Sequence, residues 1–325
     1  MNFWNSLPKP FFVLAPMEDV TDVVFRQVVA RAARPDVFFT EFMNVSGFCH
    51  PDGRESVARR LQTSPTDTPI VAQIWGSKPE KFSLTARELA RIGFAGIDIN
   101  MGCPDKSVVK SGGGSALIAS SELAVEIIKA VQNSTDLPVS VKTRLGYSKV
   151  DEWRDWLKIL LEQDLDALTV HLRTRKEMSK VPAHYELIPG IIKLRDGIAP
   201  KTKLIINGDI ANRSAGAALI EKYPGIDGIM IGRGVFANPY CFEKTPIKHS
   251  REDLMDLLKH HLDLFDKNTI TYFQKSGTVP IKYKPLKKFF KIYINNFPGA
   301  SDLRARLMAT KTAAEAREIL DSAGA

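Results

Sequence analysis

A unit that recurs about eight times within the first 243 residues constrains the fold most strongly. Each unit has a short apolar run, then a polar or glycine-containing turn, and most continue into a stretch with helical spacing. The apolar runs predict buried strands at 11–15, 37–39, 71–75, 97–99, 138–143, 167–171, 204–207 and 226–231. Strands that alternate with helices favour parallel pairing through right-handed crossovers. The sequence therefore predicts an α/β protein, and specifically a (β/α)8 barrel (TIM barrel) rather than an open sheet.

Helices are expected between these strands and again after them. The first is expected at 21–33, with Thr21 as its N-cap, and others at 80–91, 121–131 and 152–163. The barrel is expected to end near residues 240–241, 245–248 has the composition of a linker, and from Arg251 onward no strand–helix unit remains. Apolar residues then recur at three and four positions from Leu254 to Phe265, and further helices are expected at 283–295, 303–308 and 313–320. We expect two domains, a catalytic barrel at 1–243 and a small all-helical domain at 244–325.

Charge is unevenly distributed between these two parts. The net charge is +8 with a pI near 9.3. Residues 244–325 hold 15 lysines and arginines against 9 acidic residues, whereas residues 1–243 hold 30 against 28. A basic C-terminal part suggests a polyanionic partner, although a solvated lysine-rich surface would give the same count.

The remaining composition favours a cytoplasmic protein. The three cysteines are far apart and odd in number, which predicts neither a disulfide framework nor a metal site. No apolar run is long enough to span a membrane, and the N-terminus lacks the features of a secretory signal. We expect no membrane association and a monomer.

One cysteine stands in a setting typical of an active site. Cys103 follows the fourth predicted strand, which is expected to stop at Asn100, and it lies between Gly102 and Pro104. Three consecutive glycines, residues 112–114, come shortly afterwards. An isolated free cysteine is more often a small buried hydrophobe. The surrounding asparagine, proline and glycines favour the active-site interpretation here.

Other strand ends predict a phosphate-binding site. Gly232-Arg233-Gly234 follows the eighth predicted strand and Asn207-Gly208 follows the seventh. Barrels often bind phosphate through the loops after these two strands, although two ordinary turns are the alternative. Lys142 and Gln73 are polar residues inside otherwise apolar strands, where a flavin ring would be a suitable partner. Because a G-x-G-x-x-G motif is absent after the first strand, a mononucleotide is favoured over a dinucleotide.

An ordered series of motifs resembles the flavin-dependent tRNA dihydrouridine synthases. The most specific is N-M-G-C-P-D-K-S-V-V-K-S-G-G-G-S-A-L at 100–117. The others are A-P-M-E at 15–18, T-E-F at 40–42, Q-I at 73–74, V-K-T-R-L-G at 141–146, V-H-L-R-T-R at 170–175, I-N-G-D-I at 206–210, M-I-G-R-G at 230–234, K-K-F-F-K-I-Y at 287–293 and F-P-G-A at 297–300.

The resemblance implies a role for each matching residue. It implies FMN bound by Pro16, Met17, Glu18, Gln73, Lys142, His171, Asn207, Gly208, Asp209, Gly232 and Arg233. It implies that Asn100 holds the target uracil and that Cys103 is the general acid. It implies RNA-phosphate contacts from Arg173, Lys282, Lys284, Lys287, Lys288 and Lys291. The chain departs from the family pattern at Leu172, where a small residue is usual, and at 183–185, where A-H-Y replaces a triplet resembling A-D-W.

The implied reaction is the reduction of the C5–C6 double bond of uridine in tRNA. NADPH, or alternatively NADH, would reduce FMN, and no metal would be needed. Two other functions fit parts of the sequence. A flavin barrel enzyme that acts on a small molecule would use the same phosphate loops, but it does not account for the basic tail. An RNA-binding protein on an inactive barrel does not account for the cysteine, lysine and histidine at the strand ends.

Overall fold

A parallel sheet curls into a nearly closed barrel in the computed structural model, which describes residues 2–267, 269–271, 278–280 and 282–324. The strand order is β1-β9-β8-β7-β6-β5-β4-β2. These strands are β1 (Phe11–Leu14), β2 (Phe38–Phe39), β4 (Ile70–Trp75), β5 (Gly96–Met101), β6 (Val139–Arg144), β7 (Ala167–His171), β8 (Lys203–Asn207) and β9 (Gly228–Ile231). β1 pairs with β9, and a bridge between Val13 and Val37 joins β1 to the start of β2. The predicted (β/α)8 barrel is thus confirmed.

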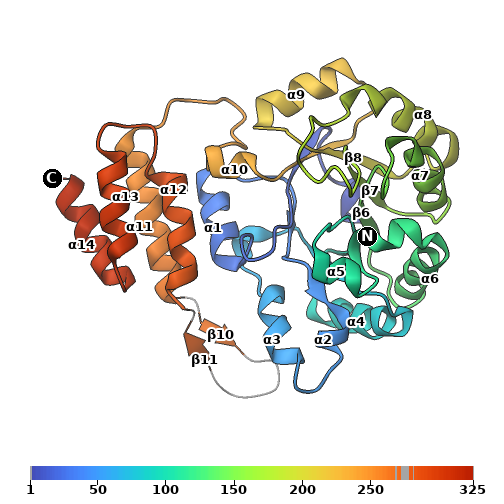
Figure 1. Cartoon of the computed structure of the whole chain (residues 1–325), viewed down its shortest axis with the longest axis horizontal. Helices are drawn as coiled ribbons and strands as arrows, with labels where there is room; N and C mark the ends of the chain where they lie inside the picture. Colours follow the sequence, from blue (N-terminus) through green and yellow to red (C-terminus); the bar gives the residue numbers. More distant parts are fainter. Residues whose placement is uncertain (1, 268, 272–277, 281, 325) are drawn as a thin grey trace.

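Helices cover the outside of this barrel (Figure 1). They are α1 (Val23–Ala32), α2 (Val45–Phe48), α3 (Arg54–Ala58), α4 (Pro79–Ile92), α5 (Lys106–Lys110), α6 (Ser121–Gln132), α7 (Trp153–Leu161), α8 (Ile188–Ile198), α9 (Arg213–Lys222) and α10 (Gly234–Ala237). A short strand, β3 (Met43–Asn44), adds to the end of β4. The barrel helices expected from the sequence are therefore present, with ends that differ by at most two residues.

Two local predictions differ from the structure. β5 continues past Asn100 to Met101 because these residues still pair with Lys142 and Thr143 of β6. The N-cap of α1 is Asp22, whose Oδ1 accepts a hydrogen bond from the backbone N–H of Phe25 at 2.8 Å. The predicted N-cap, Thr21, instead accepts a hydrogen bond at Oγ1 from the N–H of Met17 at 2.9 Å. Thr21 therefore fixes the loop before the helix rather than the helix itself.

A tryptophan near the N-terminus closes the end of the barrel at which the strands begin. Trp4 lies in a 3-10 helix (Phe3–Asn5) and is buried. Its ring centroid lies 5.7 Å from that of Phe11 and 6.5 Å from that of Phe39. It packs with inward-facing residues of several strands, among them Val71 and Met230. This apolar layer fills the barrel toward the ends at which the strands begin. The polar side chains therefore lie toward the carboxyl ends of the strands.

The C-terminal part is helical and packs against the side of the barrel. Its helices are α11 (Arg251–Lys267), α12 (Phe290–Tyr293), α13 (Ala300–Ala309) and α14 (Ala313–Gly324), which lie together beside α1 and α10 in Figure 1. A short antiparallel pair that the sequence analysis did not predict, β10 (Thr269–Thr271) and β11 (Thr278–Pro280), follows α11. No helix in these described ranges combines the length and apolarity needed to cross a bilayer.

Candidate active site

Two cavities lie at the carboxyl ends of the barrel strands. The first has a volume of about 610 Å³, and we name it the Lys142 cavity. The predicted cofactor residues that line it are Pro16, Met17, Lys142, His171, Asn207, Gly208, Asp209, Gly232 and Arg233. The second, of about 510 Å³, contains Cys103 and Glu18, and we name it the Cys103 cavity. Residues scattered over more than 200 positions of the sequence therefore meet at one end of the barrel.

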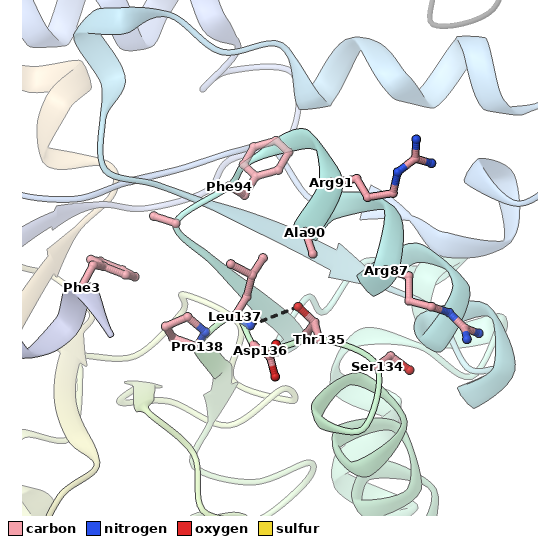
Figure 2. A pocket seen from close by; sticks show the side chains of 11 residues that line it. Phe3, Arg87, Ala90, Arg91, Phe94, Ser134, Thr135, Asp136, Leu137 and Pro138 are labelled. Carbon is pink, nitrogen blue, oxygen red and sulfur yellow. Dashed lines mark hydrogen bonds between the residues drawn. The ribbon is translucent and has the colours of Figure 1, made fainter. Parts of the chain in front are cut away.

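A larger cavity, of about 740 Å³, lies elsewhere (Figure 2). Its lining includes Ala95 and Pro138, which directly precede β5 and β6, so it belongs to the amino ends of the strands. Arg87 and Arg91 point outward, and Leu137 donates a hydrogen bond from its N–H to Thr135 Oγ1 at 3.1 Å. Stability rather than chemistry is the usual role of this end of a barrel, so the cavity's size does not make it the candidate site.

Cys103 is held by its backbone on both sides. Asn100 Oδ1 accepts hydrogen bonds from the N–H groups of Cys103 at 2.9 Å and Gly102 at 3.1 Å. The carbonyl of Cys103 accepts from both the N–H (3.0 Å) and the hydroxyl (2.9 Å) of Ser115. Gly114 has a φ of 56°, and a side chain there would collide with the Cys103 carbonyl. Asn100 and the glycine run therefore fix the turn, while the thiol remains in its cavity.

Burial raises the pKa of the Cys103 thiol above its ordinary value. A hydrogen bond from the backbone of Asp105 and the charge of Arg144 lower the pKa, but they do not overcome burial. The thiol is therefore protonated near neutral pH. A protonated thiol in a cavity has the chemistry of a proton donor.

A chain of buried polar side chains connects β4, β5 and β6. Asn100 Nδ2 donates to Gln73 Oε1 at 2.9 Å, and Gln73 Nε2 donates to Asp98 Oδ2 at 2.7 Å. Ser140 donates to the other carboxylate oxygen of Asp98 at 2.6 Å. Burial raises the pKa of Asp98 to about 6. Gln73 and Asn100, predicted to meet flavin and uracil, thus already have protein partners, and Asp98 was missed although its charge inside an apolar strand is visible in the sequence.

Lys142 stands inside the barrel at the cavity floor. Its Nζ donates to Asn207 Oδ1 at 3.2 Å, and Asn207 Nδ2 in turn donates to the carbonyl of Met230 at 2.8 Å. Burial lowers the pKa of Lys142 to about 8, and the nearby charge of Arg144 acts in the same direction. An anionic group in the cavity would relieve both effects.

Arg144 is a cavity residue that the sequence analysis did not single out. Its Nε donates to the carbonyl of Gly102 at 2.8 Å, and its Nη1 donates to the carbonyl of Met178 at 2.9 Å. Burial lowers the pKa of Arg144 to about 10. Because side chains on a strand alternate, Lys142 and Arg144 share one face of β6. That spacing was the signal available in the sequence.

His171 contributes a half-buried ring at the end of β7. Burial lowers its pKa well below the ordinary value, and Arg144 and Lys142 reinforce that shift. The ring is therefore neutral. Its Nδ1 is buried and has no hydrogen-bond partner within the described part of the chain. An unpaired buried nitrogen at a cavity wall is available to a ligand.

The loops after β7, β8 and β9 bring an acidic and two basic groups together. Asp209 forms ion pairs with Arg173 and, at 2.9 Å, with Arg233. Gly208 has a φ of 121°, which excludes other residues at the turn. Arg173 is only 2% exposed, so it does not reach the surface that an RNA phosphate would approach. Its buried Nη1 lacks a partner among the described residues and is an available hydrogen-bond donor.

The predicted RNA-binding lysines lie on the C-terminal part, on or beside the 3-10 helix Lys284–Phe289 and α12. Lys282, Lys284, Lys288 and Lys291 are exposed and Lys287 is half-buried. Two of the five form hydrogen bonds within the protein. Lys287 Nζ donates to the carbonyl of Met308 at 2.8 Å, and Lys288 Nζ donates to the carbonyl of Asp19 in the loop after β1.

A parallel barrel with cationic and polar side chains gathered at the carboxyl ends of its strands defines the class of (β/α)8-barrel proteins with a strand-end active site. The sequence profile of the family described as Dihydrouridine synthase (Dus) matches residues 13–324. This chain belongs to the dihydrouridine synthase family.

Similar proteins cover nearly the whole chain. A "Probable tRNA-dihydrouridine synthase" from Staphylococcus aureus (strain COL) is 58% identical over 98% of this chain and 95% of its own length. A "Probable tRNA-dihydrouridine synthase 2" from Bacillus subtilis (strain 168) is also 58% identical, over 98% and 96%.

Two solved structures share the fold. Histamine dehydrogenase from Rhizobium sp. 4-9 matches 78% of this chain and 48% of its own length, with a TM-score of 0.55 and 11% identity. A variant of NCR from Zymomonas mobilis matches 76% and 95%, with a TM-score of 0.50 and 17% identity. At these identities the likeness concerns the barrel alone.

Proposed function

We propose that this chain is a tRNA-dihydrouridine synthase, a flavin-dependent oxidoreductase that reduces the C5–C6 double bond of uridines in tRNA. It uses FMN, with NADPH as the electron donor and NADH as the alternative, and acts in the cytoplasm. The relatives are named tRNA-dihydrouridine synthases, which supports tRNA as the substrate. The observation that carries the proposal is the thiol of Cys103, which is kept protonated in a cavity at the end of β5.

The Lys142 cavity fits FMN in its donors and its space. Lys142 offers a cation, while His171 Nδ1 and Arg173 Nη1 are buried polar atoms without partners in the described residues. Gly208 and Gly232 keep the loops after β8 and β9 free of side chains, so their backbone can approach a phosphate. When bound, FMN supplies the hydride that reduces the uracil ring.

Cys103 supplies the proton that completes the reduction. The hydride goes to C6 and the proton to C5, so the ring gains one hydrogen at each carbon and the thiol becomes a thiolate. Arg144 faces this charge, since the guanidinium and the thiol interact electrostatically. Asn100 keeps the turn in place through its two backbone hydrogen bonds. A thiol positioned in this way contributes roughly 10²–10⁴-fold to a proton-transfer step.

The uridine has to leave its base stack to reach Cys103. Base flipping costs a few kcal/mol, which contacts to RNA phosphates can offset. The exposed lysines Lys282, Lys284 and Lys291 suit such contacts. Binding is therefore expected to weaken as salt concentration rises.

The test compares Cys103→Ala with wild type on tRNA that lacks dihydrouridine. We expect Cys103→Ala to retain FMN absorbance and RNA affinity but to lose about 10²–10⁴-fold in dihydrouridine formation, measured by mass spectrometry of nucleosides. Cys49→Ala is the matched control, because Cys49 contacts Lys81 and Thr85 on the outer helix α4. Normal turnover by Cys103→Ala would remove Cys103 from the acid role. Absence of dihydrouridine with wild type and either nicotinamide would refute the function.

A further inference from the structure

The loop between β1 and α1, residues 15–22, links the two cavities and is called the first loop here. Met17 lines the Lys142 cavity, and the next residue, Glu18, lines the Cys103 cavity. Asp19 has a φ of 56°, in the left-handed region that non-glycine residues seldom adopt. A small backbone rotation at Asp19 would move Met17 and Glu18, so the position of these two residues depends on the contacts that hold the first loop.

Three residues of the barrel part hold one side of the first loop. Glu41 Oε1 accepts a hydrogen bond from the N–H of Asp19 at 2.6 Å. Arg60 Nε donates to Glu18 Oε1 at 3.0 Å, and Arg59 forms an ion pair with Asp19 at 3.3 Å. These contacts fix the N–H of Asp19 and the side chains of Glu18 and Asp19. The carbonyl of Asp19 is left for another hydrogen-bond donor.

That donor comes from the C-terminal part of the chain. Lys288 Nζ donates to the carbonyl of Asp19, and its charge also acts on Asp22, the N-cap of α1. The backbone of Lys288 is anchored by its neighbour Phe289, which is buried and stacks on Phe25 of α1 with ring centroids 4.9 Å apart. Lys288 therefore reaches the loop from a fixed position.

We propose that Lys288 is a positioning residue for the active site, which holds the first loop and thereby Met17 and Glu18, rather than a ligand of RNA phosphate. The inference rests on the proposed function and corrects the role that the resemblance implies for this lysine. Lys284 lies four residues earlier on the same 3-10 helix, is exposed, and remains a predicted phosphate ligand. The two lysines therefore form a matched pair with different expected behaviour.

The first experiment measures the first loop directly and needs no turnover. Hydrogen exchange of residues 15–22 is compared between wild type, Lys288→Met, Lys288→Arg and Lys284→Met, with FMN bound. We expect roughly fivefold faster exchange in Lys288→Met, recovery in Lys288→Arg, and no change in Lys284→Met. Unchanged exchange in Lys288→Met would overturn the proposal.

The second experiment separates positioning from phosphate binding. Log affinity for tRNA is plotted against log salt concentration, where each phosphate contact contributes a slope of about 0.7–0.9. We expect Lys284→Met to lose about that amount and Lys288→Met to keep the wild-type slope, while its single-turnover rate at saturating tRNA falls about fivefold. Lys311→Met, on an exposed lysine outside both groups, serves as the control for rate. A reduced slope with an unchanged rate in Lys288→Met would assign it to RNA instead. Failure of wild type to form dihydrouridine would refute the function but not the exchange result.

Discussion

Lys142 shows how one partly buried charge can define a ligand. It lies in β6 between the buried residues Val141 and Thr143, and its ammonium contacts Asn207 rather than a carboxylate. A cation in such a place is less stable than in water, and its pKa falls to about 8 as a result. The free energy lost is recovered when an anionic group enters the cavity. Lys142 is therefore expected to contribute more to ligand binding than to folding.

The affinity for FMN should depend on pH through Lys142. As pH rises through about 8, the ammonium loses its proton, and affinity for an anionic ligand should fall, by at most tenfold per pH unit. Lys142→Arg should flatten this decline because a guanidinium stays charged. Titration of the apoprotein with FMN between pH 6.5 and 9.5, followed by flavin fluorescence, measures the effect. A wild-type affinity that is constant above pH 8 would contradict it.

Sequence reasoning located these residues better than it located their partners. Cys103, His171 and Asn207 were placed correctly at strand ends, and Lys142 inside a strand, because the spacing of apolar residues and the composition of turns are local properties. Whether a side chain faces a ligand or another side chain is not local. Gln73 and Asn100 contact each other across two strands, so the sequence alone could not show that their amides are largely occupied.

The loop after β7 is held by hydrogen bonds from Tyr185 and His184. Tyr185 donates from its hydroxyl to the carbonyl of Gly208 at 2.7 Å, which ties this loop to the loop after β8. His184 lies between two carboxylates, with Nε2 2.9 Å from Glu177 and Nδ1 2.8 Å from Glu186. The residues that depart from the family pattern thus hold one wall of the Lys142 cavity in place.

This loop should be better ordered at acidic than at alkaline pH. Burial disfavours the charged form of His184, but hydrogen bonds with Glu177 and Glu186 outweigh it and raise the pKa. The stabilisation is therefore complete below the unfolded-state pKa of about 6.5 and is lost as pH rises through the higher folded-state pKa. The pair is partly solvated, so the effect should not exceed about 1 kcal/mol, or fivefold in hydrogen exchange near Tyr185. His184→Gln should abolish the pH dependence; an unchanged profile in that variant would contradict this account.

At the scale of the whole molecule, the C-terminal helices share a core with the barrel. Phe25 of α1 contacts His261 of α11 and Phe289, and His261 Nδ1 is 2.7 Å from the hydroxyl of Tyr293. The apolar stripe from Leu254 to Phe265 predicted a helix, which is present as α11, and Leu257, Leu258, His261 and Leu262 of that stripe are buried. The stripe could not show what covers the face, because a periodic pattern contains no information about its partner.

Unfolding at mildly acidic pH should report on this shared core. Burial lowers the pKa of His261 to about 3, so the folded protein keeps the ring neutral while the unfolded chain takes up a proton below about pH 6.5. Stability should therefore fall by up to about 1.4 kcal/mol per pH unit on this account. Urea unfolding at pH 7.5, 6.5 and 5.5 should show a smaller loss for His261→Leu than for wild type. His50→Gln, at an exposed site, should behave like wild type, and equal losses in all three proteins would exclude His261 as the source.

The position of Trp4 at the end of the barrel where the strands begin has a consequence for the order of ligand binding. Trp4 fills the end of the barrel at which the strands begin, so within the described structure a ligand would enter from the opposite end, where the Lys142 and Cys103 cavities lie. A nicotinamide and a flipped nucleotide would then use the same entrance and bind one after the other. On the proposed function, electron delivery and RNA reduction would therefore be successive binding events at the same end of the barrel.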